Sequence, residues 1–186
     1  MIKHFNDRKS IVHRILRLMP VIGLLALLVG CTASTAQPSQ PVVGAEAPDF
    51  TLPALSGETL RLSELQGRVV IINFWASWCQ PCVNETPRLV SWYEQHSGDG
   101  LQVIGVDTLY QDSRESVETF AREYQVSYPV LLDEVGDISR QWQARQLPRS
   151  YVVDREGVLR FVRIGELTER DFEQQVRPLL EQAQDG

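Results

Sequence analysis

The sequence has 186 residues, of which 43% are hydrophobic and 23% are charged, and its formal net charge is −6 at pH 7. This composition is typical of a globular chain with a single core, and it excludes a disordered or fibrous protein. The acidic balance argues against nucleic acid as a partner. Both lysines, Lys3 and Lys9, lie at the start of the chain, which excludes Schiff-base chemistry and a lysine-based phosphate loop in the remainder.

The first thirty residues have the pattern of an export signal. They begin with a basic region that contains Lys3, Arg8, Lys9, Arg14 and Arg17. The run from Leu18 to Val29 is almost wholly apolar, but it is shorter than the ~20 residues that a membrane-spanning helix needs. We therefore expect residues 1–30 to be a signal peptide, with an uncleaved membrane anchor as the alternative.

The residues Leu28 to Cys31 resemble the lipobox of bacterial lipoproteins, in which a cysteine is lipidated and becomes the new N-terminus. Thr32 to Pro41 follows, a stretch rich in Ser, Thr, Gln and Pro that is typical of a flexible tether. We expect lipidation at Cys31, a lipidated tether over residues 31–45, and a protein anchored by lipid to a membrane on the extracytoplasmic side of the cell envelope. A cysteine that merely ends an ordinary signal is the alternative.

The first half of the predicted domain contains a hairpin followed by a strand, a helix and a second strand. Ala47 to Leu62 alternates apolar and polar residues around a Ser-Gly turn, which predicts a β-hairpin. Val69 to Trp75 and Leu101 to Asp107 are continuous runs rich in β-branched residues, as in strands buried on both faces. Gln80 to about His96 has a helical pattern between them, and a βαβ crossover makes its two strands parallel.

The second half continues with helix, strand, helix, a strand pair and a final helix. The expected elements are a helix over Ser113 to Tyr124, a strand over Pro129 to Asp133, a short helix over Asp137 to Ala144, strands over Ser150 to Asp154 and Val158 to Ile164, and a helix over Thr168 to about Gln182. This order predicts an α/β thioredoxin-like fold over residues 46–186. Its central mixed β-sheet would be flanked by helices, with an N-terminal β-hairpin and a central helical insertion.

Cys79 and Cys82 stand two residues apart where the first buried strand gives way to a helix. The free N–H groups and the dipole at a helix N-terminus stabilise an anion, and such placement lowers a cysteine pKa from ~8.5 to between ~3.5 and ~7.5. Cys79 would then attack a disulfide, and Cys82, one turn further, would resolve the mixed disulfide. The alternative is a structural disulfide, which would stabilise little because it closes so small a loop.

A closed zinc site is excluded because the domain has no second cysteine pair and His96 is its one histidine. Resolution by Cys82 requires a base, and Glu85 lies three residues further on the same helical face. If buried, its carboxyl would have a raised pKa and could accept and donate a proton near neutral pH. The alternative is an ordinary solvated carboxylate.

The stretches APDFTL, VVIINFWASWCQPCVNETP, YPVLLD and LPRSYVVDREG resemble the TlpA/ResA-like branch of the thioredoxin superfamily. Members of that branch are membrane-tethered thiol-disulfide oxidoreductases of the bacterial envelope. The resemblance implies that Cys79 attacks, that Cys82 resolves and that Glu85 is the active-site glutamate. It also implies a cis Pro148 facing the cysteines, with the Leu147 backbone free to bond an extended substrate.

Trp78 matches the family too and is expected to shield the attacking cysteine within the substrate-binding surface. Two residues depart from the family pattern: Gln146 stands where glycine is common and Arg149 where threonine is common. An arginine beside the cysteines could stabilise a thiolate or select an acidic partner. The identity of the partner is therefore open.

The resemblance implies an enzyme that exchanges electrons with protein disulfides, in the reducing direction, with the Cys79–Cys82 disulfide as its redox group and without a bound cofactor or metal. Its expected partners are protein thiols and disulfides, with apocytochrome c as a candidate, and a membrane thiol carrier that supplies electrons. We expect a monomer. The alternatives are a peroxiredoxin-like peroxidase, since Ala47 to Leu62 resembles that class, and a copper carrier, which would need a histidine such as His96.

Overall fold

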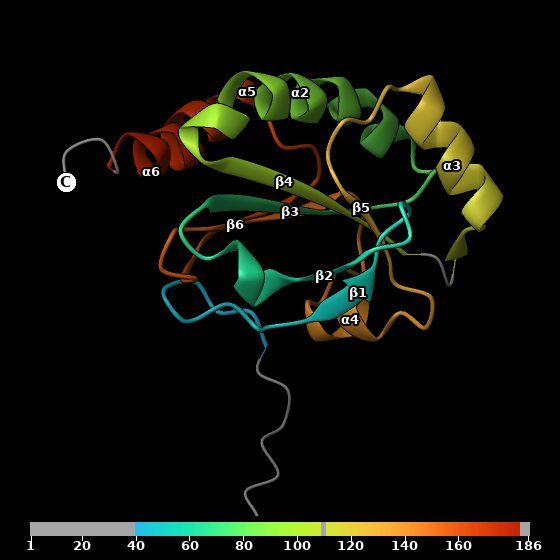
Figure 1. Ribbon diagram of the computed structural model, residues 1–186, viewed down its shortest axis with the longest axis horizontal. Coiled ribbons are helices and arrows are strands. Elements are labelled where there is room, and N and C mark those ends of the chain that lie inside the picture. Colours follow the sequence, from blue (N-terminus) through green and yellow to red (C-terminus); the bar gives the residue numbers. More distant parts are fainter. Residues whose placement is uncertain (1–39, 109–110, 183–186) are drawn as a thin grey trace, which may run out of the picture. The chain divides into compact units, whose positions relative to one another are not determined.

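The computed structural model describes residues 40–108 and 111–182, so the predicted signal peptide, Cys31 and most of the predicted tether lie outside the described residues. The helices and strands follow one another as labelled in Figure 1. They are β1 (Thr51–Pro53), β2 (Thr59–Arg61), β3 (Val69–Trp75), α2 (Gln80–His96), β4 (Leu101–Asp107), α3 (Arg114–Glu123), β5 (Val130–Leu132), α4 (Asp137–Gln141), β6 (Arg149–Val153), β7 (Leu159–Ile164), α5 (Glu169–Asp171) and α6 (Arg177–Glu181).

A five-stranded mixed sheet in the order β5-β4-β3-β6-β7 forms the centre of the domain. β3, β4 and β5 are parallel, whereas β6 is antiparallel to β3 and β7 is antiparallel to β6. The helix α2 joins β3 to β4, as the sequence predicts. Every residue of β3 and β4 is buried, because helices or loops cover both faces of these central strands. The predicted α/β fold with a mixed sheet is confirmed.

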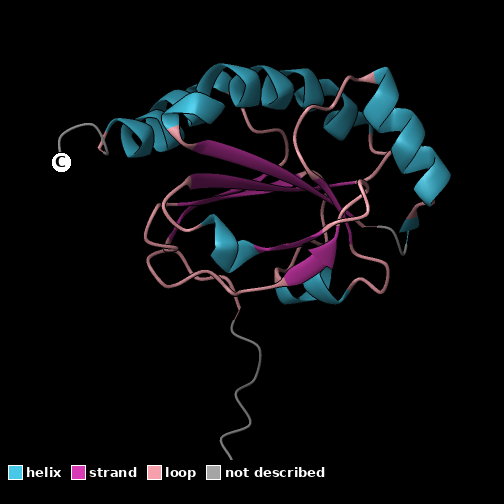
Figure 2. Cartoon of the chain, in the orientation of Figure 1, coloured by secondary structure: helices cyan, strands magenta, loops and turns pink. Residues whose placement is uncertain are grey.

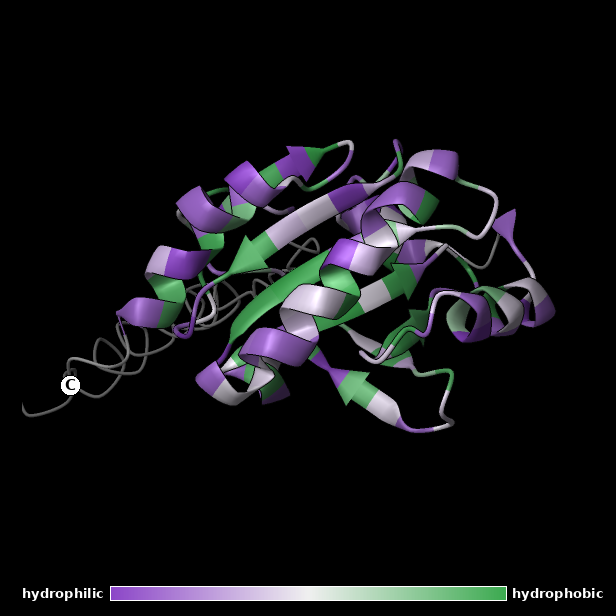
Figure 3. Ribbon diagram, turned by 90° about the horizontal axis from the view of Figure 1, so that it is seen from above, coloured by the Kyte–Doolittle hydropathy of each residue, from purple (hydrophilic) through white to green (hydrophobic). Residues whose placement is uncertain are grey.

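Helices α2, α3, α5 and α6 lie over one face of the sheet, and α4 with the β1–β2 hairpin lies over the other (Figures 1 and 2). On the first face Leu89 and Trp92 of α2 pack with Phe172. On the second face Phe50 and Trp142 belong to a separate buried cluster. Figure 3 shows the central strands as the most hydrophobic elements, whereas the helices alternate hydrophobic and hydrophilic residues, as expected for helices with one buried face.

The last predicted helix is divided in the structure. After α5, which Thr168 caps through a capping box, residues Phe172–Val176 form a π-helical turn that leads into α6. The turn ends at Arg177, whose N–H donates to the Phe172 carbonyl, directly before Pro178. Because proline has no N–H to donate, it cannot continue the hydrogen-bond ladder. This tertiary detail was absent from the sequence prediction.

Gly44 and Ala45, directly before the predicted domain, form hydrogen bonds with β7. The Gly44 N–H donates to the Leu159 carbonyl at 2.8 Å, and the Leu159 N–H donates to the Ala45 carbonyl at 2.9 Å. Gly44 and Ala45 are the last two residues of the predicted tether. They can pair with β7 because it is the edge strand of the sheet and has free backbone groups.

Candidate active site

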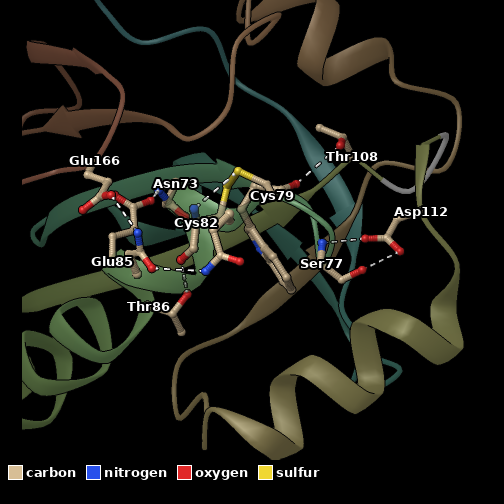
Figure 4. Close-up of a disulfide and its surroundings, with 12 residues drawn as sticks. Asn73, Ser77, Cys79, Cys82, Glu85, Thr86, Thr108, Asp112 and Glu166 are labelled. Atoms are coloured by element: carbon tan, nitrogen blue, oxygen red, sulfur yellow. Dashed lines mark hydrogen bonds between the residues drawn. A yellow bond between two sulfur atoms is a disulfide. The ribbon is translucent and has the colours of Figure 1, made fainter.

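Cys79 and Cys82 form a disulfide at the start of α2, with their Cα atoms 5.2 Å apart (Figure 4). Cys79 is the N-cap residue, and its sulfur accepts the Cys82 N–H at 3.4 Å. A thiolate formed at Cys79 on reduction would therefore be stabilised by a helix N–H that has no backbone acceptor. Cys79 is 5% exposed and Cys82 is 1% exposed. Cys79 is therefore the more exposed of the two cysteines.

The turn that precedes Cys79 is held by Asp112, in the segment between β4 and α3. The Asp112 carboxylate accepts the Ser77 N–H at 2.6 Å and the Ser77 hydroxyl at 2.9 Å (Figure 4). Behind the pair, the Thr86 hydroxyl donates to the Cys82 carbonyl at 2.8 Å. These contacts fix the backbone on both sides of the disulfide, so the two sulfurs keep their relative positions. No local pattern predicts this role of Asp112, which lies 35 residues from Ser77 in the chain.

Glu85 is completely buried, and each of its carboxylate oxygens accepts one hydrogen bond. The Asn73 amide donates to Oε1 at 2.6 Å, and the Leu167 N–H donates to Oε2 at 2.7 Å. Burial is the largest cause of a rise in the pKa of Glu85 to about 7, although both hydrogen bonds and Arg88 act in the opposite direction. The carboxyl can thus exchange a proton near neutral pH, one turn of helix away from Cys82.

Two residues that support Glu85 were not found from the sequence. Asn73 lies in the middle of β3, and its amide also donates to the Ser150 hydroxyl of β6 at 2.9 Å. Asn73 and Ser150 are register partners in the antiparallel β3–β6 pair. Their position inside buried strands could have marked Asn73 and Ser150 as functional residues, because a buried polar side chain needs a hydrogen-bond partner. The identity of that partner depends on the sheet register.

A groove of about 250 Å³ opens beside the disulfide. Its lining consists of Trp78, Cys79, Gln80, Pro81, Thr108, Gln111, Ala144, Arg145 and Leu147. The Leu147–Pro148 peptide bond is cis, as the resemblance implies. Trp78 is 58% exposed, and its indole N–H donates to the Gln111 carbonyl at 2.9 Å. The structure therefore brings the attacking cysteine, Trp78 and Leu147 together around one open surface.

Arg149 does not lie beside the cysteines, contrary to the expectation from its position after Pro148. Successive side chains of a strand point to opposite faces, and Ser150 faces the Asn73–Glu85 side. The Arg149 guanidinium instead donates to the Gln143 carbonyl at 2.8 Å and lies 5.4 Å from the centre of the Tyr151 ring. Arg145, which the sequence analysis did not select, is the arginine that lines the groove with Cys79.

Asp107, at the end of β4, is another buried carboxyl of the domain. It is completely buried, and neither carboxylate oxygen has a hydrogen-bond partner within residues 40–108 and 111–182. Burial, followed by repulsion from Asp112 and Asp133, raises the pKa of Asp107 to about 8. Asp107 therefore keeps its proton at neutral pH. The sequence analysis treated it only as the last residue of a strand.

His96 is placed where it cannot share a metal ion with the cysteines. It ends α2, whereas Cys79 caps the other end of this 17-residue helix, and a helix of that length extends roughly 25 Å. Its ring lies against Phe172, with 5.3 Å between ring centroids, and contacts the Asp99 carboxylate at 3.3 Å. A copper carrier that uses His96 together with the cysteine pair is thus not supported by this geometry.

Comparison with known proteins places the chain in a family. Residues 43–162 match the AhpC/TSA family. The thioredoxin-like protein YneN of Bacillus subtilis is 35% identical over 134 residues, which cover 72% of this chain and 78% of YneN. The thiol-disulfide oxidoreductase ResA of the same organism is 30% identical over 138 residues, which cover 73% of this chain and 76% of ResA.

Solved structures agree with the sequence relatives. A crystal structure named as a DsbE thiol:disulfide interchange protein of Chlorobium tepidum matches with a TM-score of 0.69 and 29% identity, over 75% of this chain and 99% of that chain. StoA of Bacillus subtilis matches with a TM-score of 0.60 and 25% identity, over 70% of this chain and 96% of that chain. Because both sequence and fold are shared over most of these proteins, the chain belongs to the AhpC/TSA family and is a thioredoxin-like thiol-disulfide oxidoreductase of the ResA type.

Proposed function

We propose that this oxidoreductase reduces disulfides of protein substrates on the extracytoplasmic side of a bacterial membrane, to which a lipid on Cys31 tethers it. The observation that carries the proposal is the position of Cys79, which caps α2 and lines an open groove next to the cis Pro148. An extended substrate in that groove would present its disulfide to the Cys79 sulfur and its backbone to Leu147.

The reaction follows from the order of the two sulfurs. In the reduced protein the Cys79 thiolate attacks one substrate sulfur, the substrate S–S bond breaks, and the other substrate sulfur leaves as a thiolate that takes up a proton. Glu85 then accepts the Cys82 proton, and the Cys82 thiolate attacks the Cys79 sulfur. The second substrate sulfur leaves with a proton, and the protein becomes the disulfide seen in the structure. Two electrons and two protons pass to the substrate.

The tether and the electron source belong to the same proposal. An oxidising envelope does not regenerate dithiols, so the reduced state requires a membrane thiol carrier that returns two electrons. ResA-type relatives and the N-terminal pattern support this location, and a haem-binding apocytochrome c is the candidate substrate. Among the described residues, no helix is long and apolar enough to cross a membrane. Mass spectrometry of the exported protein and of a Cys31→Ser variant would detect the lipid, which only the unmodified sequence should carry.

Trapping in cells tests the function directly. A Cys82→Ser variant should accumulate mixed disulfides with its protein substrates, because Cys79 attacks but no second sulfur resolves the product. Non-reducing gels and mass spectrometry would identify the captured proteins, and a Cys79→Ser, Cys82→Ser double variant is the matched control. Rapid consumption of hydrogen peroxide by the Cys82→Ser protein, without captured substrates, would instead favour the peroxidase alternative.

A Glu85→Gln variant should resolve the mixed disulfide about a hundredfold more slowly at pH 7, because general acid–base catalysis contributes on that order. In the unmodified protein we expect the rate to rise through the Glu85 pKa of about 7, whereas the variant should speed up only at the higher pH where Cys82 ionises unaided. Stopped-flow measurements from pH 5 to 9 would show both profiles.

The stability of the Glu85→Gln variant must be measured beside its rate. The folded pKa of Glu85 lies above its ordinary value of 4.5, so ionisation of this carboxyl destabilises the fold as the pH rises from about 4.5 to 7. Glutamine removes this titration, but its amide nitrogen cannot accept the second of the two hydrogen bonds, so urea unfolding at pH 7 should confirm that the variant is folded where the rates are measured. Identical pH profiles for the two proteins would remove Glu85 from the mechanism.

Among the described residues that line the groove, Arg145 is the one that carries a charge, which predicts a preference for acidic substrates. Arg145→Ala should lower the rate constant for reduction of oxidised glutathione, an anionic disulfide, by about threefold, as for an exposed ion pair. The rate for cystamine, a cationic disulfide, should stay the same or rise. Arg140→Ala is the matched control, because Arg140 is paired with Asp137 and does not line the groove. Equal effects on both disulfides would contradict the prediction.

A further inference from the structure

The loop of residues 165–167, between β7 and α5, supplies one of the two hydrogen bonds to Glu85. The Leu167 N–H reaches the buried Oε2 atom at 2.7 Å, although Leu167 lies 82 residues from Glu85 in the chain. This bond requires the loop to stay pressed against α2. The Leu167 side chain is buried in the core cluster with Leu89 and Phe172, and the Gly165 N–H donates to the Pro148 carbonyl at 2.9 Å, whereas Glu166 holds the loop at its partly exposed edge.

Glu166 links the loop to α2 at two points on either side of Glu85. Its carboxylate accepts the Asn84 amide at 3.3 Å and the Arg88 guanidinium at 3.0 Å. Figure 4 shows Glu166 directly beside Glu85. From the opposite side, the Arg163 guanidinium donates to the Glu166 carbonyl at 3.2 Å. The loop is therefore held to consecutive turns of the helix immediately next to the N–H that Glu85 receives.

We propose that Glu166 is a positioning residue, which holds the 165–167 loop on Asn84 and Arg88 so that the Leu167 N–H remains on the Glu85 carboxylate. Its consequence for the reaction rests on the proposed proton transfer by Glu85. The hydrogen bond from the Leu167 N–H to Glu85 can be tested whether or not Glu85 transfers a proton. An ion pair whose side chains are 36% and 34% exposed would otherwise contribute little to this protein.

Two effects of removing Glu166 have opposite signs, which makes the proposal testable. The Glu166 charge raises the pKa of Glu85 and the Arg88 charge lowers it. Loss of the Glu166 charge alone would therefore lower the Glu85 pKa. Loss of the Leu167 N–H would raise it, because that hydrogen bond favours the ionised carboxylate. The second effect should be larger, since the N–H is in direct buried contact whereas Glu166 is screened by water.

The other groups around Glu85 do not titrate in the same range. Asn73 on β3 and Ser150 on β6 are uncharged. Burial raises the pKa of Tyr128, which interacts electrostatically with Glu85, so that its hydroxyl stays neutral. In the oxidised protein Cys82 is held in the disulfide. Arg163 contacts the Asp171 carboxylate at 3.6 Å, and neither residue is changed in the variants below.

The test measures the Glu85 carboxyl pKa by carbon-13 NMR in the oxidised full chain. Glu166→Ala should raise this pKa by about one unit through loss of the N–H bond. In Glu166→Gln, whose side chain can still accept a hydrogen bond from Arg88, the Glu85 pKa should be unchanged or slightly lower. Glu173→Ala is the control, because Glu173 is also exposed and paired with an arginine, Arg177, but does not contact the loop. A lower or unchanged pKa in Glu166→Ala, or an equal rise in Glu173→Ala, would overturn the proposal.

Kinetics then separate this proposal from the proposed function. If Glu85 transfers the proton, a one-unit rise in its pKa shifts the pH profile of mixed-disulfide resolution upward by one unit and slows the reaction at pH 7 about fivefold. Glu166→Gln should restore the unmodified profile. A raised pKa with an unshifted rate profile would support the positioning role of Glu166 and reject the proton transfer by Glu85.

Discussion

Replacement of Cys79 by serine should abolish disulfide exchange, with a loss of roughly a thousandfold or more, because a hydroxyl at this position cannot form the attacking thiolate. Replacement of Cys82 should have a different effect. Cys79, which caps α2 and lines the groove, would still attack once, and the reaction would stop at the mixed disulfide. Insulin reduction followed by turbidity measures turnover, and stopped-flow kinetics measure the first attack.

The matched pair of variants separates the two roles. Cys79→Ser should show neither the first attack nor turnover, whereas Cys82→Ser should show one rapid attack per chain and no turnover. The assignment would be reversed if Cys82→Ser were inert and Cys79→Ser attacked the substrate. The lower exposure of Cys82, 1% against 5% for Cys79, is the physical reason to expect the first pattern.

Replacement of Asp107 by asparagine should raise the free energy of unfolding at pH 7 by about 4 kcal/mol, the largest stability effect that we expect from a single change. An unfolded aspartate ionises near its ordinary pKa of 3.8, whereas the folded carboxyl keeps its proton until about pH 8. Folding is therefore opposed increasingly as the pH rises through this window. Asparagine has a similar shape and no proton to lose.

The pH dependence distinguishes this effect from altered packing. Below about pH 4 the variant and the unmodified protein should have similar stability, and the difference should grow up to about pH 8. Urea unfolding of the oxidised protein at several pH values would measure it. Asp137→Asn is the control, because the Asp137 side chain is 71% exposed and its replacement should change stability by less than about 1 kcal/mol. A constant difference at all pH values would refute the titration of Asp107.

The boundaries of the central elements could be predicted from local sequence. Val69–Trp75 and Leu101–Asp107 are strands with the predicted bounds, because long β-branched runs have few other stable conformations. The helix Gln80–His96 was likewise found from local signals. The last helix was predicted less well, since its π turn has no local signature other than Pro178.

The sequence by itself predicted that Cys79, Cys82 and Glu85 lie close together, because they fall within two turns of one helix and their spacing fixes their relative positions. Only the tertiary structure decided what surrounds them. The partners of Glu85 come from β3 and from the loop before α5, and strand alternation turns Arg149 away while Arg145 enters the groove. Such contacts join residues distant in the chain, and they depend on sheet register and loop docking, which no local pattern encodes.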